Sequence, residues 1–397
     1  METRQERGFE IAKQKQVKPN GNGWTVQSQS GHGVYHVGED FDCDCPDCQT
    51  RQTTCKHAFA VRYYLQVEKE TPKGLEVERV RLSYPQAWKA YNAAQTEEIH
   101  LFDELLKDLV AGIDEPEQET GRPRLPLREQ AFCAIQKVYS QLSSRRAASL
   151  YFNAKERKQI TKAPNFNAIN KFLNHAEITP ILERLVAVSA APLKAVETEF
   201  AVDSTGFTTS QFGAYCNDKY QMHRKHEFVK AHACVGVKTN IVASVAVTDC
   251  NGADITQFPA LVANTAKGFT IEEVSADKAY SSRDNLEFVA DFGGKAYIPF
   301  KKNATGKMGG SMAWKKLYHL FSLHADEFYE HYHKRSNVES TFAAIKKKFG
   351  EKLKNKNPVS QKNELLCKII AYNLTVVIHE MKEIGVTPNF RESSLGS

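Results

Sequence analysis

The stretch "EFAVDSTGF" at residues 199–207 decides the fold class expected for this chain. The residues before it have helical periodicity, whereas it is a short run of apolar and β-branched residues that ends in polar and turn-forming ones. Similar runs follow, with helix-like stretches between the later ones, at 229–237, 241–249, 272–280 and 295–300. Three consecutive strands followed by strand–helix alternation predict an α/β fold with a mixed sheet.

Three carboxylates stand out around these runs. Asp203 and Asp277 each follow an apolar run and precede small or turn-forming residues, so each is expected where a strand leaves the sheet. An aspartate in such a place is often only a turn or helix cap. Phosphodiester chemistry with two metal ions, however, needs carboxylates that hold the ions roughly 4 Å apart, and Glu339 on a predicted helix supplies a third.

That helix is predicted within "YHKRSNVESTFAAIKKKFG" at residues 332–350. At the helical period, Tyr332, Arg335, Glu339 and Lys346 share an arc of about 60°, directly beside an apolar stripe. A polar stripe at the edge of a buried face suggests one wall of a cleft for an anion. The alternative is an i,i+4 salt-bridge ladder on a solvated face.

The positive charge of the chain is concentrated in one place. Between residues 334 and 356 there are eight Lys or Arg and two Glu, a surplus that equals the net charge of +6 of the whole chain. Such clustering is typical of a protein that binds a polyanion, most simply nucleic acid. A solvated basic helix end is the other interpretation.

The spacing Tyr332, Arg335, Glu339, Lys346 resembles the Y-R-E-K signature of one branch of bacterial insertion-sequence transposases of the DDE type. "DSTGF" and "DKAYSS" resemble the motifs around that family's two aspartates, and the strand with Lys230 and His232 resembles the one after the first aspartate. The resemblance covers about residues 128–380. It implies a ribonuclease-H-like catalytic domain in which Asp203, Asp277 and Glu339 bind two Mg²⁺ or Mn²⁺ ions, with Asp203 bridging both.

The resemblance also implies a function. Such a protein binds the terminal inverted repeats of a mobile element as double-stranded DNA, cleaves the ends and joins the 3′-hydroxyls to target DNA. A homodimer on paired ends and a cytoplasmic, nucleoid-associated location in a bacterium are then expected. DNA contacts are expected from Tyr332, Arg335, Lys346 and Lys278. Two alternatives are a domesticated DNA-binding protein and a Mg²⁺-dependent nuclease without strand transfer.

Two departures from the family pattern appear. Ala279 stands where many relatives have Gly, a change we expect to be tolerated. Only 32 residues separate Lys302 from Arg335, so any insertion there must be small and helical.

A second metal site is predicted near the N-terminus. Cys43, Cys45, Cys55 and His57 form two close ligand pairs, the donor set of a closed, structural Zn²⁺ site. The pattern resembles the SWIM-type zinc finger, with a binding role and no chemistry of its own. Cys48 could replace one ligand, and four free cysteines in a loop are the alternative. The other five cysteines are scattered, which favours a reducing compartment over a disulfide framework.

The region between the finger and the catalytic domain is predicted to be helical. "SQLSSRRAASLY" and "ITKAPNFNAINKFLNHAEI" suggest a helix-turn-helix, although a plain helical bundle fits nearly as well. Its candidate DNA-contacting residues are Arg145, Arg146, Asn167, Asn170 and Lys171. No run of 18 apolar residues is present, so no membrane partner is expected. The predicted domains are a zinc-finger module (1–75), a helix and linker (76–126), a helical DNA-binding region (127–197), the catalytic domain (198–381) and a tail (382–397).

Overall fold

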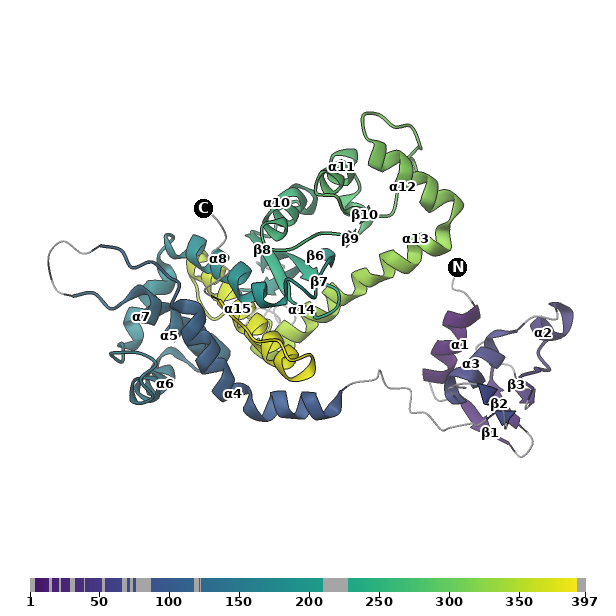
Figure 1. The fold of residues 1–397 in the computed structure, drawn as a ribbon, viewed down its shortest axis with the longest axis horizontal. Helices are drawn as coiled ribbons and strands as arrows, with labels where there is room; N and C mark the ends of the chain where they lie inside the picture. Colours follow the sequence, from purple (N-terminus) through teal and green to yellow (C-terminus); the bar gives the residue numbers. More distant parts are fainter. Residues whose placement is uncertain are drawn as a thin grey trace, which may run out of the picture. The chain divides into compact units, whose positions relative to one another are not determined.

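The computed structural model describes residues 4–13, 16–20, 23–28, 33–38, 40–51, 54–65, 70–71, 74–75, 87–117, 121, 123–209 and 228–390. The chain forms two compact units, Met1–Ala87 and Trp88–Ser397, and each is described by itself (Figure 1).

The first unit is a small three-stranded antiparallel sheet, in the order β1-β2-β3, with helices around it. Its elements are α1 (Arg4–Lys13), β1 (Val17–Pro19), β2 (Gly23–Gln27), β3 (Val34–Gly38), α2 (Pro46–Arg51), α3 (Lys56–Leu65) and a short pair β4 (Glu70–Thr71) and β5 (Gly74–Leu75). Helices α1 and α3 pack closely because Gly8 has no side chain; a Cβ there would lie 2.6 Å from the Cβ of Phe59. Ile11, Val26 and Val61 are fully buried between helices and sheet.

The second unit begins with helices. They are α4 (Trp88–Val110), α5 (Leu127–Tyr139), α6 (Ser144–Glu156), α7 (Phe166–Asn174) and α8 (Ile178–Ala190), followed by the 3-10 turn η1 (Ala191–Leu193). Asn165 begins α7 as a helix cap, since its side chain accepts a hydrogen bond from the N–H of Asn167. The sequence therefore predicted the helical character of 127–197.

A five-stranded mixed sheet follows, in the order β10-β9-β6-β7-β8. The strands are β6 (Glu199–Thr208), β7 (Phe228–Gly236), β8 (Val242–Thr248), β9 (Glu273–Ala276) and β10 (Lys295–Tyr297). β7 is antiparallel to β6 and β8, whereas β9 is parallel to β6 and β10. The predicted mixed α/β class is confirmed, and the strand order is consistent with the ribonuclease-H-like fold that was expected.

Helices cover both faces of this sheet (Figure 1). The remaining helices and turns of the unit are α10 (Asp254–Ala266), the turn η2 (Lys278–Tyr280), α11 (Arg283–Asp291), α12 (Met312–Leu323), α13 (Ala325–Tyr332), the turn η3 (His333–Arg335), α14 (Ser336–Phe349) and α15 (Pro358–Glu383). α10 lies against one face, and α14 and α15 lie against the other. The segment between Lys302 and Arg335 consists of turns and irregular structure up to Ser311 and is helical from Met312 on, apart from His324.

One helix joins the sheet to the N-terminal helices of the unit. α15 is buried along most of its length and packs on α4, α5, α7 and α8. Asn373 on α15 is fully buried; its side chain accepts a hydrogen bond from the N–H of Val242 (3.0 Å) and donates one to the carbonyl of Val242 (2.9 Å). It thereby satisfies a backbone position at the edge strand β8, which would otherwise be buried without partners.

This packing changes the predicted domain boundaries. A helix and a linker were predicted over 76–126, but α4 packs on α15, and Glu115 accepts hydrogen bonds from the N–H groups at the start of α5. Residues 114–117 and 123–126 therefore lie within the second unit, and the units divide between Ala87 and Trp88. The helical region and the sheet share one core. In the predicted tail, Phe390 is buried, whereas residues 391–397 lie outside the described part.

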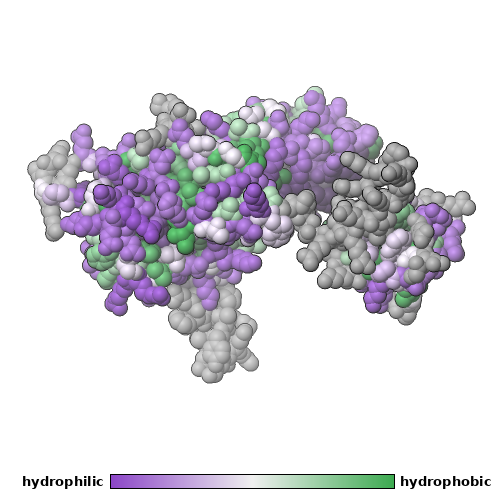
Figure 2. Space-filling view, turned by 60° about the horizontal axis from the view of Figure 1, so that its bottom comes forward, coloured by the Kyte–Doolittle hydropathy of each residue, from purple (hydrophilic) through white to green (hydrophobic). Residues whose placement is uncertain are grey.

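The surface seen in Figure 2 is mostly hydrophilic, with apolar side chains confined to limited areas. Within the described part of the chain, none of the helices combines the length and the apolar character that a membrane crossing requires.

Candidate active site and candidate metal centre

The sequence predicted Asp203 at the end of a strand, but Asp203 lies in the middle of β6. The strand continues to Thr208 because β7 pairs with it over its whole second half. The parallel pairing with β9, however, stops at Val202 and Ala276. Asp203 is therefore the first residue beyond the parallel pair, at the carboxyl end where open α/β sheets place their sites.

Asp277 occupies the equivalent position on β9, directly after its last residue, Ala276. It begins the turn η2, and its carboxylate accepts a hydrogen bond from the N–H of Lys278 at 2.7 Å. The capping role that was the alternative interpretation thus exists. It does not exclude a site, because Asp277 comes next in register to Asp203 and each carboxylate keeps a free oxygen lone pair.

The third carboxylate comes from the helical segment 325–349. The sequence predicted one helix here, but η3 interrupts it between Tyr332 and Ser336, so α13 and α14 are two helices in line. Tyr332 ends α13, whereas Glu339 lies in the first turn of α14. A 3-10 helix has three residues per turn instead of 3.6. The angle between Tyr332 and Glu339 about the helix axis therefore differs from the angle in a regular α-helix.

Arg335 joins two of the carboxylates. Its Nη1 lies 2.8 Å from Oδ2 of Asp203 and its Nη2 lies 2.6 Å from Oε1 of Glu339. The i,i+4 salt bridge of the alternative interpretation is therefore present, but the same guanidinium also reaches a strand 132 residues away in sequence. One cation is held between two carboxylates from different elements.

The charge state of Asp203 reflects this crowding. Burial raises its pKa, and the neighbouring charges of Glu339 and Asp277 raise it further, while the N–H of Ser204 and the guanidinium of Arg335 lower it. The net direction is upward. The three carboxylates thus repel one another, and a bound divalent cation would relieve this repulsion. Their all-oxygen donor set suits Mg²⁺ or Mn²⁺. The structure brings Asp203 and Glu339 to one guanidinium, but the three carboxylates do not form a group with all ligand atoms within 4.8 Å.

The other residues predicted to contact DNA here lie at different distances from the carboxylates. Tyr332 lies near the carboxylates: its ring is 6.0 Å from the guanidinium carbon of Arg335, and burial together with the charge of Asp277 raises its pKa. Lys278 is exposed beside Asp277. Lys346 lies farther along α14, with its ammonium 5.4 Å from the ring of Phe207 and 3.7 Å from Glu351.

A buried polar network on the other face of β6 was not predicted. His232 is fully buried opposite Ser204, with Nε2 2.9 Å from Oγ1 of Thr248 and Nδ1 3.1 Å from Oδ1 of Asp254. Lys230 lies 2.6 Å from the same oxygen of Asp254. Burial lowers the pKa of His232. Lys230 and His232 were noticed in the sequence, but Asp254 carries no local signal because it resembles any helix-start aspartate.

Several cations of the basic tract 334–356 have partners within the protein. These partners are Glu199 and Glu273 for Lys334, Asp203 and Glu339 for Arg335, Glu351 for Lys346, Glu98 for Lys348, and the carbonyl of Gln141 for Lys354. Glu98, Glu199, Asp203 and Glu273 are distant in sequence, so a charge count along the tract could not reveal these pairs.

The candidate DNA-contacting residues of the helical region lie on α6 and α7. Arg145, Arg146, Asn167 and Lys171 are exposed. Asn170 differs, because its Oδ1 accepts hydrogen bonds from Lys137 (2.9 Å) and from Ser144 (3.0 Å). Its side-chain oxygen links α5, α6 and α7, so the Asn170 side chain serves the packing of these three helices.

In the first unit, the four predicted zinc ligands come together. The ligand atoms of Cys43, Cys45, Cys55 and His57 lie within 4.8 Å of one another, and all four residues are buried. Nδ1 of His57 lies 3.8 Å from Sγ of Cys43 and 3.9 Å from Sγ of Cys55. A tetrahedron with the usual Zn–S and Zn–N lengths has such an edge of about 3.6 Å. The group does not include Cys48.

The electrostatics of the cluster favour metal binding. The contact with Cys43 lowers the pKa of Cys55 to about 3, and the same contact raises the pKa of Cys43. Thiolates crowded in a buried site are stabilised by a cation, and they are the form that Zn²⁺ binds. The donor set of three sulfurs and one imidazole therefore fits a structural Zn²⁺ ion.

Residues 194–374 match a family model described as the transposase DDE domain, which covers less than half of the chain. Neither the curated proteins nor the solved structures gave a match. The matched segment contains Asp203, Asp277 and Glu339, together with the whole five-stranded sheet and the helical segment 325–349. The segment of this chain that carries the three carboxylates is thus similar to the transposase DDE domain.

Proposed function

We propose that this protein is a DNA transposase that binds the terminal inverted repeats of a mobile element, cleaves its ends and joins the 3′-hydroxyls to target DNA. The observation that carries the proposal is the meeting of Asp203 and Glu339 on one guanidinium, beside Asp277, inside the segment that matches the transposase DDE domain. This is a site that holds positive charge between carboxylates at the carboxyl end of a parallel strand pair.

In this proposal Asp203, Asp277 and Glu339 hold two Mg²⁺ or Mn²⁺ ions. Bound there, the ions supply activation of the attacking oxygen and stabilisation of the leaving one. The protein fixes where they bind: the sheet holds both aspartates, and α14, packed on β6, presents the glutamate. Because Asp203 is half-buried and Glu339 is more exposed, the glutamate side faces the solvent from which DNA approaches.

Arg335 has two roles in this proposal. Without metal it neutralises Asp203 and Glu339. If Asp203 and Glu339 held metal ions, the guanidinium would be free for a phosphate, which it can bind through two parallel hydrogen bonds. Tyr332 and Lys278 lie beside the same carboxylates and would contact the DNA backbone close to the cut, whereas Lys346 would contact it farther along α14.

End recognition is assigned to other parts of the chain. Arg145, Arg146, Asn167 and Lys171 are exposed on two adjacent helices, in keeping with a helix-turn-helix that binds the terminal repeat. The first unit would bind DNA or a protein partner through its zinc-stabilised fold. A homodimer on paired ends, in the cytoplasm of a bacterium and on its nucleoid, completes the proposal.

The test is Mg²⁺-dependent cleavage of duplexes that carry the inverted repeats flanking the gene. Asp203→Asn, Asp277→Asn and Glu339→Gln should each abolish cleavage and leave end binding largely intact. Retained cleavage in any one of them contradicts the triad. Cleavage without joined products and target duplication would point to a nuclease, and binding without cleavage by the unaltered protein would point to a domesticated DNA-binding protein.

A further inference from the structure

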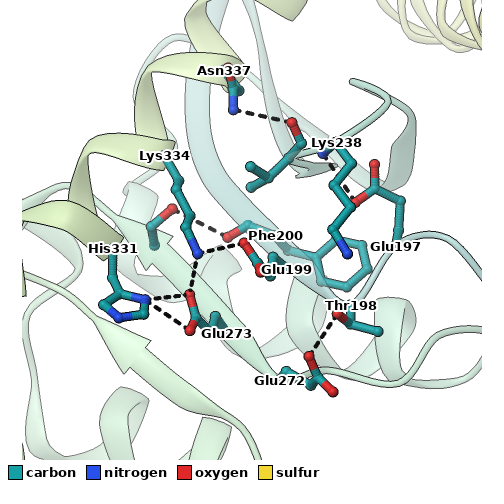
Figure 3. Close-up of polar contacts among 12 residues, drawn as sticks. Glu197, Thr198, Glu199, Phe200, Lys238, Glu272, Glu273, His331, Lys334 and Asn337 are labelled. Carbon is teal, nitrogen blue, oxygen red and sulfur yellow. Dashed lines mark hydrogen bonds and ion pairs between the residues drawn. The ribbon is translucent and has the colours of Figure 1, made fainter. Parts of the chain in front are cut away.

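Four ionisable residues form a cluster at the start of the parallel strand pair β6 and β9, whereas Asp203 and Asp277 follow the end of that pair. Glu199 and Glu273 are the first residues of β6 and β9, and they lie side by side in the parallel register. Nζ of Lys334 lies 2.6 Å from Oε2 of Glu199 and 2.9 Å from Oε2 of Glu273. Nδ1 of His331 lies 2.9 Å from Glu273 (Figure 3). We call these four residues the strand-start cluster.

The strand-start cluster needs its cation. Two glutamates directly side by side on neighbouring strands repel each other, and their side chains are only 22% and 19% exposed, so water screens them poorly. Burial alone would lower the pKa of Lys334, but the contacts with Glu199 and Glu273 raise it. The ring of His331 also stacks on Tyr297 of β10, with centroids 4.4 Å apart and planes 8° from parallel. These contacts fasten η3 and the end of α13 to three strands.

The contacts follow one face of the helical segment 325–349. His331, Lys334 and Asn337 are spaced by three residues, and Nδ2 of Asn337 donates to the carbonyl of Val237 at 3.1 Å (Figure 3). Residues with this spacing share a face, whereas Arg335 and Glu339 are related by four and lie on an adjacent one. The segment thus has one polar face fixed to the sheet and another that presents the candidate active site.

Lys334 and Arg335 reach different residues of the same strand. Glu199 and Asp203 are four residues apart on β6, about 13 Å at the usual rise. Arg335 cannot serve as a permanent anchor if it leaves Asp203 when metal binds. The strand-start cluster contacts none of the proposed metal ligands, so it can persist in both states.

We propose that Lys334 is a positioning residue: by tying η3 to Glu199 and Glu273 it fixes the rotation of α14 and so the place of the Glu339 carboxylate, independently of Arg335. This inference rests on the proposed function. It concerns affinity for the divalent cation, since Glu339 is 58% exposed and is held among the described residues by Arg335 alone.

The test compares Lys334→Gln with Lys334→Arg in the full-length chain. Binding of Mn²⁺ without DNA is followed by electron paramagnetic resonance, and cleavage gives kcat and the KM for Mg²⁺. We expect Lys334→Gln to weaken Mn²⁺ binding about tenfold, as is usual for groups that orient metal ligands, and to raise the KM for Mg²⁺ while end binding is unchanged. Lys334→Arg should restore both.

Lys348→Gln is the matched control. Lys348 pairs with Glu98 at 2.6 Å, its side chain is 32% exposed against 28% for Lys334, and it lies near the far end of the same segment. We expect its Mn²⁺ affinity to stay within about twofold of the unaltered protein, at a similar loss of thermal stability. An equal loss of Mn²⁺ affinity in Lys348→Gln would overturn the inference, as would unaltered Mn²⁺ affinity in Lys334→Gln.

Two further variants separate the possible failures. If Lys334→Gln does not fold, the double variant Glu199→Gln with Glu273→Gln removes the same ion pairs without leaving repelling charges, and unaltered Mn²⁺ affinity in it overturns the inference. Asp203→Asn reports on the proposed function. If it keeps Mn²⁺ binding and cleavage, the proposed function fails and the inference fails with it. If it loses both while Lys334→Gln keeps both, only the inference fails.

Discussion

Replacing Arg335 with glutamine should make the DNA-free protein bind Mn²⁺ more tightly. The guanidinium lies 2.8 Å from Asp203 and 2.6 Å from Glu339, so it competes directly with a metal cation for both. A unit charge pair at about 4 Å is worth about 4 kcal/mol at the effective dielectric constant near a protein surface. Because Glu339 is more than half exposed, solvent screening reduces this to about 1–2 kcal/mol. The expected gain in affinity is therefore about tenfold.

The assay is a Mn²⁺ titration followed by electron paramagnetic resonance, at pH 8. The pH matters because Arg335 lowers the pKa of Asp203, which burial has raised; the variant must be measured where Asp203 is still ionised. Lys346→Gln is the control, since Lys346 contacts Glu351 instead, and its Mn²⁺ affinity should stay unaltered. Cleavage by Arg335→Gln should fall, because a phosphate contact is lost. Unchanged or weaker Mn²⁺ binding would refute the competition and show that Arg335 holds the carboxylates in place.

Three further predictions concern stability. Chelation of zinc, or Cys55→Ser, should abolish the unfolding transition of the first unit and leave that of the second in place. Calorimetry can follow the two transitions separately, and a profile that neither chelation nor the substitution changes would contradict a structural zinc site. Asn373→Leu leaves the backbone of Val242 without its partners, so the free energy of unfolding in urea should fall by about 2–4 kcal/mol; a loss below 1 kcal/mol would mean that β8 finds another partner. Burial lowers the pKa of Lys368 to about 8 from 10.5. The unfolded chain then binds more protons between these pH values, so stability should rise from pH 8 to 10.5 relative to Lys368→Met, and parallel pH profiles would contradict it.

Much of the fold was predictable because its signals are local. The runs around Asp203 and His232 alternate or continue in apolar residues over a few positions, which is enough to indicate strands and the change from helices to a sheet. The zinc ligands are equally local: Cys43 and Cys55 are twelve positions apart, and a short loop can bring such residues to one ion. Hypotheses of this kind need no knowledge of distant contacts.

The candidate site was predictable as a set of residues but not as a set of contacts. The spacing from Tyr332 to Lys346 and the two aspartate motifs indicated the carboxylates. The sequence did not indicate that Arg335 pairs with Asp203, that Lys334 pairs with Glu199, or that a 3-10 turn containing both Lys334 and Arg335 interrupts the helix. Each of these partners lies more than 100 residues away.

By itself, the sequence indicated the order of helices and strands, three carboxylates as candidates and a candidate set of zinc ligands, because periodicity and spacing are properties of neighbouring residues. Only the tertiary structure decided which charges remain available, since Glu98, Glu199 and Glu273 neutralise lysines that a count along the chain had left unpaired. It also decided the division between the units, because α4 buries its apolar face against α15 at the other end of the chain. Ion pairing and burial depend on distance in space, and that distance is set only when the chain packs.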